Sequence, residues 1–187
     1  MRWEPDARGR LERAAMELYS DQGFDKTTVE EIAGRAGLTE RTFFRHFADK
    51  REVLFGGAGA LQEFLVTQVL EAPGALAPID AIAFALSQAG TAIFDERREF
   101  ARTRQAIVGA SVELRERELI KMATLATALA DALRRRGVSD PGASLAAEAG
   151  VAVFRIAFEA WVGDGADQPL ARFVRDTVDA MKTVTTE

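Results

Sequence analysis

The fold is decided by residues 28–47, TVEEIAGRAGLTERTFFRHF. The stretch begins as a helix, because the Thr28 hydroxyl can accept a backbone N–H while Glu31 reaches back across the same turn. Gly37 readily adopts a positive φ and therefore ends this helix, and Thr39 begins a second one. Two short helices separated by so few residues must turn sharply from one to the other, which predicts a helix-turn-helix.

The rest of the chain is also helical in pattern. Ala, Leu, Glu and Arg fill most of its 187 residues, and the alternating β-branched runs and Asn-Gly turns typical of strands are missing. We therefore predict an all-α protein of about nine helices, with a three-helix helix-turn-helix module over 1–48 and a larger helical module over 49–187. The predicted helices are 8–22, 28–36, 39–47, 49–71, 78–95, 97–109, 112–136, 141–163 and 168–184. The helix at 49–71 links the two modules.

Composition excludes several classes of function. The chain has no cysteine and one histidine, which excludes disulfides, thiolate or histidine-cluster metal sites and a cysteine nucleophile. It has no glycine-rich phosphate loop after a strand and no nucleophile elbow, so we expect neither a cofactor nor an enzyme. An uncharged apolar run of about 18 residues is missing and the first residues do not resemble a signal peptide, so we expect a cytoplasmic protein without membrane contact.

The second helix of the helix-turn-helix carries groups suited to DNA. In such a unit this helix lies in the major groove, and the ends of the helices meet phosphates. Arg41 can donate two hydrogen bonds to guanine, Glu40 can accept one from cytosine, and Thr42 can touch a thymine methyl. Hydroxyls and cations at helix ends suit phosphate contacts, and these residues are Thr27, Thr28, His46 and Lys50.

Residues 8–55 resemble the TetR family of bacterial repressors. The resemblance rests on GFDKTTVEEIA at 23–33, AGLT at 36–39, TFFRHF at 42–47 and DKREVL at 49–54. It implies that 1–48 is a DNA-binding module and 49–187 a ligand-binding and dimerisation module. It also implies a two-fold dimer whose last two long helices form a four-helix bundle. It also implies a pocket in the middle helices, whose filling by a small molecule releases the operator.

The resemblance extends the predicted DNA contacts. It places Phe44, Arg45, His46 and Lys50 against the sugar-phosphate backbone. The family usually has Tyr at the position of Phe44, and Glu30 lies near positions where some members present a basic residue, so both departures lower the affinity we expect for DNA. The predicted DNA-binding residues are Thr27, Thr28, Thr39, Glu40, Arg41, Thr42, Phe44, Arg45, His46 and Lys50.

Two further sets of residues follow for the larger module. Candidate ligand contacts are large or polar residues of the middle and late helices, although a stripe of Phe at helical spacing also suits a core: Phe84, Gln88, Phe100, Arg104, Ile107, Leu125, Phe154 and Phe158. The almost wholly apolar helix at 143–163 must be buried on all sides, either as the core helix of a monomer or, with the last helix, as a dimer seam. The predicted dimer contacts are Ala146, Gly150, Phe154, Trp161, Phe173, Val174, Thr177 and Met181.

The sequence thus predicts a ligand-responsive repressor. We expect a homodimer that binds a palindromic double-stranded operator and is released by a small apolar or amphipathic effector. The alternatives are a helical small-molecule-binding protein or an enzyme, in either of which the helix-turn-helix is not used. The glycines at 56, 57 and 59 suit either a soft joint in the linking helix or close helix packing.

The acidic net charge of −5 must be reconciled with DNA binding. Residues 1–55 hold 10 basic and 11 acidic side chains, so most of the negative charge lies in the larger module. A nearly neutral binding module makes few phosphate contacts. We therefore expect a shallow dependence of DNA affinity on salt.

Overall fold

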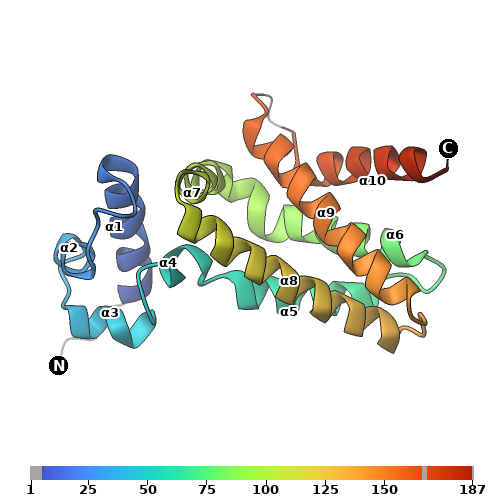
Figure 1. Cartoon of the computed structure of the whole chain (residues 1–187), viewed down its shortest axis with the longest axis horizontal. Coiled ribbons are helices and arrows are strands. Elements are labelled where there is room, and N and C mark those ends of the chain that lie inside the picture. Colours follow the sequence, from blue (N-terminus) through green and yellow to red (C-terminus); the bar gives the residue numbers. More distant parts are fainter. Residues whose placement is uncertain (1–5, 166–167, 187) are drawn as a thin grey trace. The chain divides into compact units, whose positions relative to one another are not determined.

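The computed structural model describes residues 6–165 and 168–186, and every regular element within them is helical (Figure 1). The all-α prediction is therefore confirmed. A π-helix over Gly90–Phe94 and a 3-10 turn over Asp95–Arg97 lie between α6 and α7. The α-helices are α1 Ala7–Gln22, α2 Val29–Arg35, α3 Glu40–His46, α4 Glu52–Phe55, α5 Ala58–Glu71, α6 Pro78–Ala89, α7 Arg98–Ala110, α8 Val112–Arg135, α9 Gly142–Gly163 and α10 Leu170–Thr186.

The predicted single helix at 49–71 is wrong, because two helices occupy this stretch. The turn residues Gly56 and Gly57 separate α4 from α5. A glycine inside a helix costs about 1 kcal/mol relative to alanine, so two in succession favour an interruption. The predicted α-helix at 78–95 likewise ends at Ala89 and continues as the π-helix.

The chain forms two compact units, each assembled from two segments. Unit 1 comprises Met1–Ala58 and Thr103–Glu118, and unit 2 comprises Gly59–Arg102 and Leu119–Glu187. These bounds differ from the predicted division at residue 48, because the second half of α7 and the start of α8 belong with the helix-turn-helix. The reason lies in the core of unit 1, which Ile107, Val108 and Leu114 complete.

The remainder of the unit 1 core comes from the first three helices. Leu11, Ile32 and Phe43 are each fully buried, one from each of α1, α2 and α3. Burying a large apolar side chain contributes about 1.5–3 kcal/mol, so these three residues fix the mutual packing of the short helices. The short α3 is thereby held rigidly although it is only two turns long.

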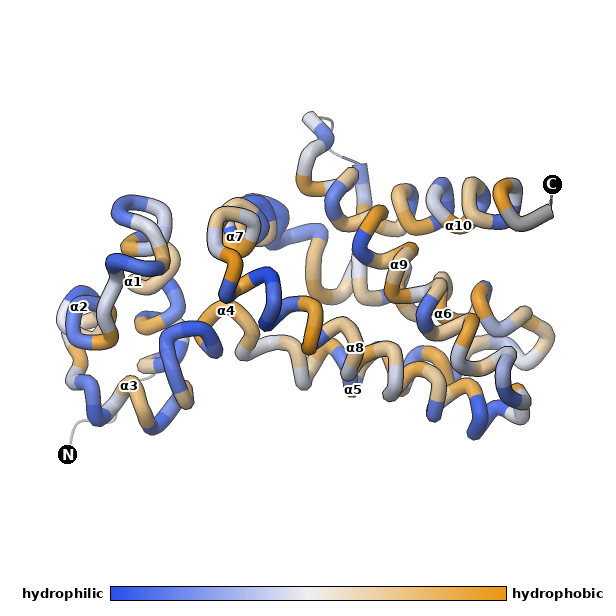
Figure 2. Tube along the Cα trace, viewed as in Figure 1, coloured by the Kyte–Doolittle hydropathy of each residue, from blue (hydrophilic) through white to orange (hydrophobic). Residues whose placement is uncertain are grey.

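Unit 2 is organised around α6, α9 and α10, which pack against one another. Gly150 of α9 faces Ile82 of α6 so closely that a Cβ atom on the glycine would lie 2.7 Å from Ile82 Cγ2. The C-terminus of α9 is capped from α7, since Arg98 donates to the Trp161 carbonyl and Arg102 to the Val162 carbonyl. Hydrophobic and hydrophilic residues alternate around α10, as expected for a helix with one buried face (Figure 2).

Within residues 6–165 and 168–186, one stretch, Glu52–Glu71, is long and apolar enough by composition to cross a membrane. We predicted no membrane-spanning stretch from the sequence, because no run of about 18 residues is both apolar and free of charges. A core helix of a water-soluble protein passes the same test, so this single stretch is weak evidence for a membrane span. In the structure it is divided between α4 and α5.

Candidate DNA-binding site

Side-chain caps fix the starts of both helices of the helix-turn-helix. The Thr28 hydroxyl accepts the Glu31 N–H at 3.2 Å, and the Glu31 carboxylate accepts the Thr28 N–H at 2.8 Å. The predicted capping box is therefore present. The same hydrogen bond from the Thr28 backbone is the main reason that the pKa of Glu31 lies below its usual range. Thr39 caps α3 in turn, with its hydroxyl 3.2 Å from the Thr42 nitrogen.

The turn between α2 and α3 requires a glycine for two reasons. Gly37 has a φ of +66°, a conformation that side chains with a Cβ rarely adopt. An Nη of Arg10 on α1 donates to the Ala36 carbonyl at 2.5 Å. A Cβ atom on Gly37 would lie 2.8 Å from that same nitrogen. The turn is thus fixed from α1, and a larger residue at 37 would disturb both the backbone and this contact.

The exposed side of α3 carries the residues predicted to meet DNA. Phe43 and Phe47 are buried and anchor the helix. Glu40, Arg41 and Arg45 are exposed, and the ring of Phe44 is 55% exposed. Two cations, one carboxylate and one apolar ring therefore project from a single rigid helix, which is the chemistry required for contacts with base edges and sugar-phosphate.

Other predicted contacts are engaged within unit 1. Thr27 is buried, and its hydroxyl donates to the Gly23 carbonyl at 2.8 Å, so the predicted phosphate contact by this side chain is corrected. Lys50 donates to backbone carbonyls of the loop before α2. Thr42 and His46 are partly buried. The Thr42 hydroxyl lies 3.1 Å from the Thr39 hydroxyl. Nε2 of His46 is enclosed and has no hydrogen-bond partner among the described residues. Thr28 and Thr39 remain exposed as well as acting as caps.

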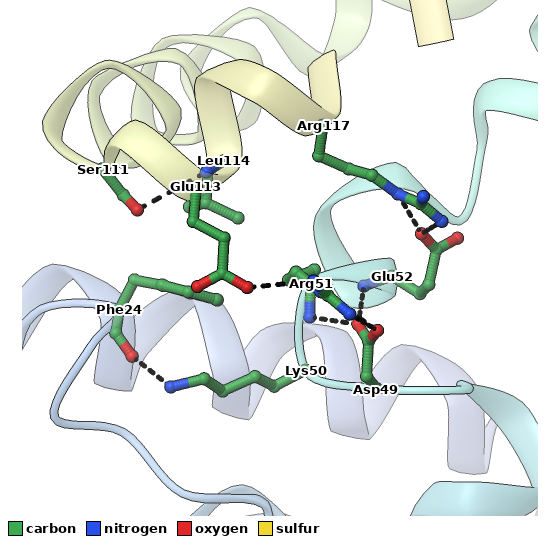
Figure 3. Close-up of polar contacts among 9 residues, drawn as sticks. All are labelled: Phe24, Asp49, Lys50, Arg51, Glu52, Ser111, Glu113, Leu114 and Arg117. Atoms are coloured by element: carbon green, nitrogen blue, oxygen red, sulfur yellow. Dashed lines mark hydrogen bonds and ion pairs between the residues drawn. The ribbon is translucent and has the colours of Figure 1, made fainter. Parts of the chain in front are cut away.

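A cluster of ion pairs that the sequence analysis missed attaches α4 to the corner between α7 and α8 (Figure 3). Arg51 bonds Asp49 and reaches Glu113 at 3.0 Å. Arg117 bonds Glu52 at 2.5 Å. The hydrogen bond from Arg51 is the main reason that the pKa of the Asp49 carboxyl lies below its usual range. The partners in the Arg51–Glu113 and Glu52–Arg117 pairs are 62 and 65 positions apart in sequence, so no local pattern reveals them.

A further ion pair within unit 1 contacts the end of α4. Arg104 donates to the Leu54 carbonyl at 2.9 Å, pairs with Glu118 at 2.9 Å, and stacks on the Phe55 ring. This predicted ligand contact therefore belongs to unit 1 and is already engaged there. Ile107, another predicted ligand contact, is buried in the same unit.

The other predicted ligand residues lie in unit 2 and are divided between its core and its surface. Leu125 and Phe154 are buried in its core, and Phe158 packs against that core. Gln88 and Phe100 are exposed, and Phe84 is partly buried. An aromatic cluster does form where the π-helix meets α9: Phe94 contacts Phe154, Phe158 and Trp161, with ring centroids 5.4–6.3 Å apart.

The predicted dimer contacts also divide. Gly150, Phe154, Trp161 and Val174 are buried within unit 2, so they are not available to a partner, and the prediction is corrected for these four. The remaining four, Ala146, Phe173, Thr177 and Met181, are partly exposed. Of these, Ala146, Phe173 and Met181 pack against the same core.

The opposite face of α9 is the one left open. Leu145 is 66% and Ile156 51% exposed. With the partly buried Ala149 and Ala152 they recur at the spacing of one helix face. Leu145 follows the buried Ala143 by two residues, which correspond to about 200° around a helix. The exposed face therefore lies almost opposite the buried one. Because both faces are apolar, periodicity alone did not distinguish them.

Comparisons with known proteins agree with this geometry. Residues 12–55 match the family model described as bacterial regulatory proteins, tetR family. Over 75 residues the chain is 40% identical to the HTH-type transcriptional regulator TcmR of Streptomyces glaucescens, a match that covers 40% of this chain and 33% of TcmR. The chain is thus matched to about a third of the length of the curated relatives.

Solved structures share the fold over nearly the whole chain. SmeT of Stenotrophomonas maltophilia, in a complex with triclosan, is 20% identical with a TM-score of 0.65, over 93% of this chain and 90% of SmeT. FadR of Bacillus subtilis, in complex with stearoyl-CoA, is 16% identical with a TM-score of 0.62, over 91% of this chain and 95% of FadR. At these identities the likeness establishes the fold alone.

Proposed function

We propose that this chain is a transcriptional repressor that reads double-stranded DNA through α3, and the match of residues 12–55 to the bacterial regulatory proteins of the tetR family supports the proposal. The observation that carries the proposal is the exposure of Glu40, Arg41, Phe44 and Arg45 on a helix anchored by Phe43. Side chains that serve only to fold the unit would not need this common outward face.

Selection of DNA from a random duplex library by the full-length chain tests the proposal. A repressor of this kind enriches a palindrome, whose half-sites lie one helical turn (about 34–36 Å) or a multiple of it apart. Failure to enrich any sequence would favour the alternative, a helical binding protein or enzyme in which the helix-turn-helix is not used. Placing the enriched site between a promoter and a reporter gene then distinguishes repression from activation.

We further propose that the protein acts as a homodimer through the exposed face of α9. Leu145, Ala149, Ala152 and Ile156 form an apolar strip with small residues between two large ones, which suits close approach of a second helix. A palindromic site requires two copies related by a two-fold axis, and an isologous interface supplies that axis.

The substitution Ile156→Glu tests this interface. It places a charge in the proposed contact, so we expect sedimentation velocity to show monomers with an unchanged helical circular dichroism spectrum. The matched control is Ile120→Glu on α8, since Ile120 is exposed to a similar extent, 57% against 51%. Dissociation by Ile120→Glu instead would move the interface to α8, and a dimeric Ile156→Glu variant would refute the α9 assignment.

The effector we propose is a mostly apolar or amphipathic small molecule bound in unit 2. Support comes from the aromatic cluster of Phe94, Phe154, Phe158 and Trp161, which lies beside a π-helix. Short π-helical turns often mark functional sites. Triclosan in SmeT and stearoyl-CoA in FadR are ligands of this chemical kind in proteins of the same fold.

Fluorescence titration tests the effector. Trp161 is one of two tryptophans, so a Trp3→Phe variant isolates its emission. We expect stearoyl-CoA or triclosan to change this emission and to release the selected DNA at the same concentrations. An emission change without DNA release would indicate binding that does not regulate, and the inducer proposal would then fail.

A further inference from the structure

Lys26 and Lys50 lie near the start of α2. The Lys50 ammonium is hydrogen-bonded within unit 1, whereas the Lys26 side chain is exposed. The Lys50 ammonium donates to the Phe24 carbonyl oxygen at 2.8 Å (Figure 3). It is also 2.9 Å from the carbonyl oxygen of Thr27 and 3.4 Å from that of Asp25. It also lies 4.3 Å from the centroid of the Phe24 ring. An ammonium has three N–H donors. Three carbonyls therefore take up its donors, and none is left for a phosphate.

The backbone of Lys50 is held as well. Its carbonyl accepts a hydrogen bond from the buried Tyr19 hydroxyl at 2.7 Å. Burial is also the main reason that the pKa of this phenol is raised, so the hydroxyl stays protonated and remains a donor. Moving the Lys50 side chain to a DNA phosphate would leave the carbonyls of Phe24 and Thr27 without this partner.

Lys26 shows the reverse arrangement. Its side chain is exposed and has no hydrogen-bond or ion-pair partner among the described residues. The loop on either side is fixed, because Thr27 is buried and hydrogen-bonded to Gly23, and Phe24 is buried beneath Lys50. The Lys26 ammonium therefore extends into solvent from an ordered segment that leads directly into α2.

We propose that Lys26, and not Lys50, contacts the DNA phosphate backbone at this edge of unit 1, and that Lys50 is a positioning residue that holds the loop carrying Lys26. The inference rests on the proposed DNA binding. In a helix-turn-helix the first helix of the motif crosses the backbone, and the 24–28 loop leads into that helix. The sequence analysis assigned the phosphate contact to Lys50 and did not consider Lys26.

The salt dependence of affinity separates the two roles. The selected duplex is titrated with full-length wild type, Lys26→Met and Lys50→Met at a series of KCl concentrations. Methionine keeps an unbranched stem without charge, so packing on the Phe24 ring is retained. Arg135→Met is the charge-matched control, since Arg135 is exposed on α8 in unit 2.

Each phosphate contact contributes about 0.9 to the slope of log affinity against log salt. A dimer lacking two Lys26 contacts should therefore lose about 1.8 from the slope, which corresponds to about a 30-fold loss of affinity at 0.15 M KCl. Lys50→Met should lower affinity by the same factor at every salt concentration and leave the slope unchanged. Arg135→Met should change neither quantity.

Two results would overturn the inference: a reduced slope in Lys50→Met, or an unchanged slope in Lys26→Met. Hydrogen exchange of the DNA-free protein tests the positioning role separately. The Thr27 N–H is bonded to the Phe24 carbonyl that Lys50 also holds. Its exchange should accelerate in Lys50→Met and not in Lys26→Met. If wild type selects no DNA, the proposed function fails, whereas the exchange result still decides whether Lys50 holds the loop.

Discussion

Replacing Gly150 by alanine tests the assignment of one face of α9 to the core. In an open helix position this change stabilises a protein by about 1 kcal/mol, through helix propensity. Here the new Cβ would lie 2.7 Å from Ile82 Cγ2 and 3.0 Å from Ile82 Cδ1, and Ile82 is fully buried. Overpacking of a core costs about 1–3 kcal/mol. The propensity gain offsets part of this cost, so we expect a net loss of up to about 2 kcal/mol in the free energy of unfolding.

Urea unfolding measures this loss, and Gly163→Ala on the same helix provides the control. Apart from its chain neighbours and the backbone of its own helix, no described atom lies within 4 Å of a Cβ built on Gly163, so this variant should be as stable as wild type or slightly more stable. The substitution Ile82→Ala makes space for the new Cβ. Its destabilisation should therefore be smaller in the Gly150→Ala background than in the wild type. A coupling of about 0.5–3 kcal/mol is usual for residues in contact.

The dimer seam predicted from the sequence leads to a different expectation for Gly150→Ala. A residue at a subunit interface would, on substitution, change the dimer dissociation constant and leave the monomer core intact. Our reasoning is refuted if Gly150→Ala is as stable as Gly163→Ala, or if it separates the dimer without lowering the stability of the subunit.

Three other substitutions probe unit 1. Arg41→Ala should cost about 1–3 kcal/mol in DNA binding and relax preference at one base pair of each half-site, whereas a uniform loss over all sequences in a gel-shift scan would indicate a phosphate contact. Thr28→Ala removes the cap of α2 and should lower the unfolding free energy by about 1 kcal/mol in urea titrations; Thr183→Ala, at an exposed position of α10, should leave it nearly unchanged. The pKa of Asp49 is lowered by Arg51, so its stabilisation is present above the unfolded-state pKa of about 3.9 and is lost as pH falls through the folded-state pKa. The stability difference between wild type and Asp49→Asn should therefore shrink in urea titrations from pH 6 to pH 3, and a difference independent of pH would exclude this linkage.

The helix-turn-helix was predictable because its determinants are local. The Thr28–Glu31 capping box, the Thr39 cap and the glycine at 37 all act within four residues in sequence. The outward face of α3 followed from the burial of Phe43, since neighbouring positions on a short helix are fixed once its anchor is known.

The errors of the sequence analysis arose where neighbours are distant. The hydroxyl of Thr27 and the ammonium of Lys50 suit a phosphate or a buried carbonyl equally well, and only the packing of the loop decides between them. The two apolar faces of α9 present the same difficulty on a larger scale. Membership of 103–118 in unit 1 depends on contacts with residues about 50 to 100 positions away, which no periodicity encodes.

The divided composition of unit 1 limits how this protein can be recombined. Chimeric regulators are commonly imagined as an exchange of one N-terminal segment for another. A junction at residue 48 would separate Leu11, Ile32 and Phe43 from Ile107, Val108 and Leu114, which complete their core. A transplant of DNA specificity must therefore either carry 103–118 along with the N-terminal segment or confine the exchange to the exposed side chains of α3. On the ribosome, likewise, the core of the DNA-reading unit cannot close until Leu114 has left the exit tunnel.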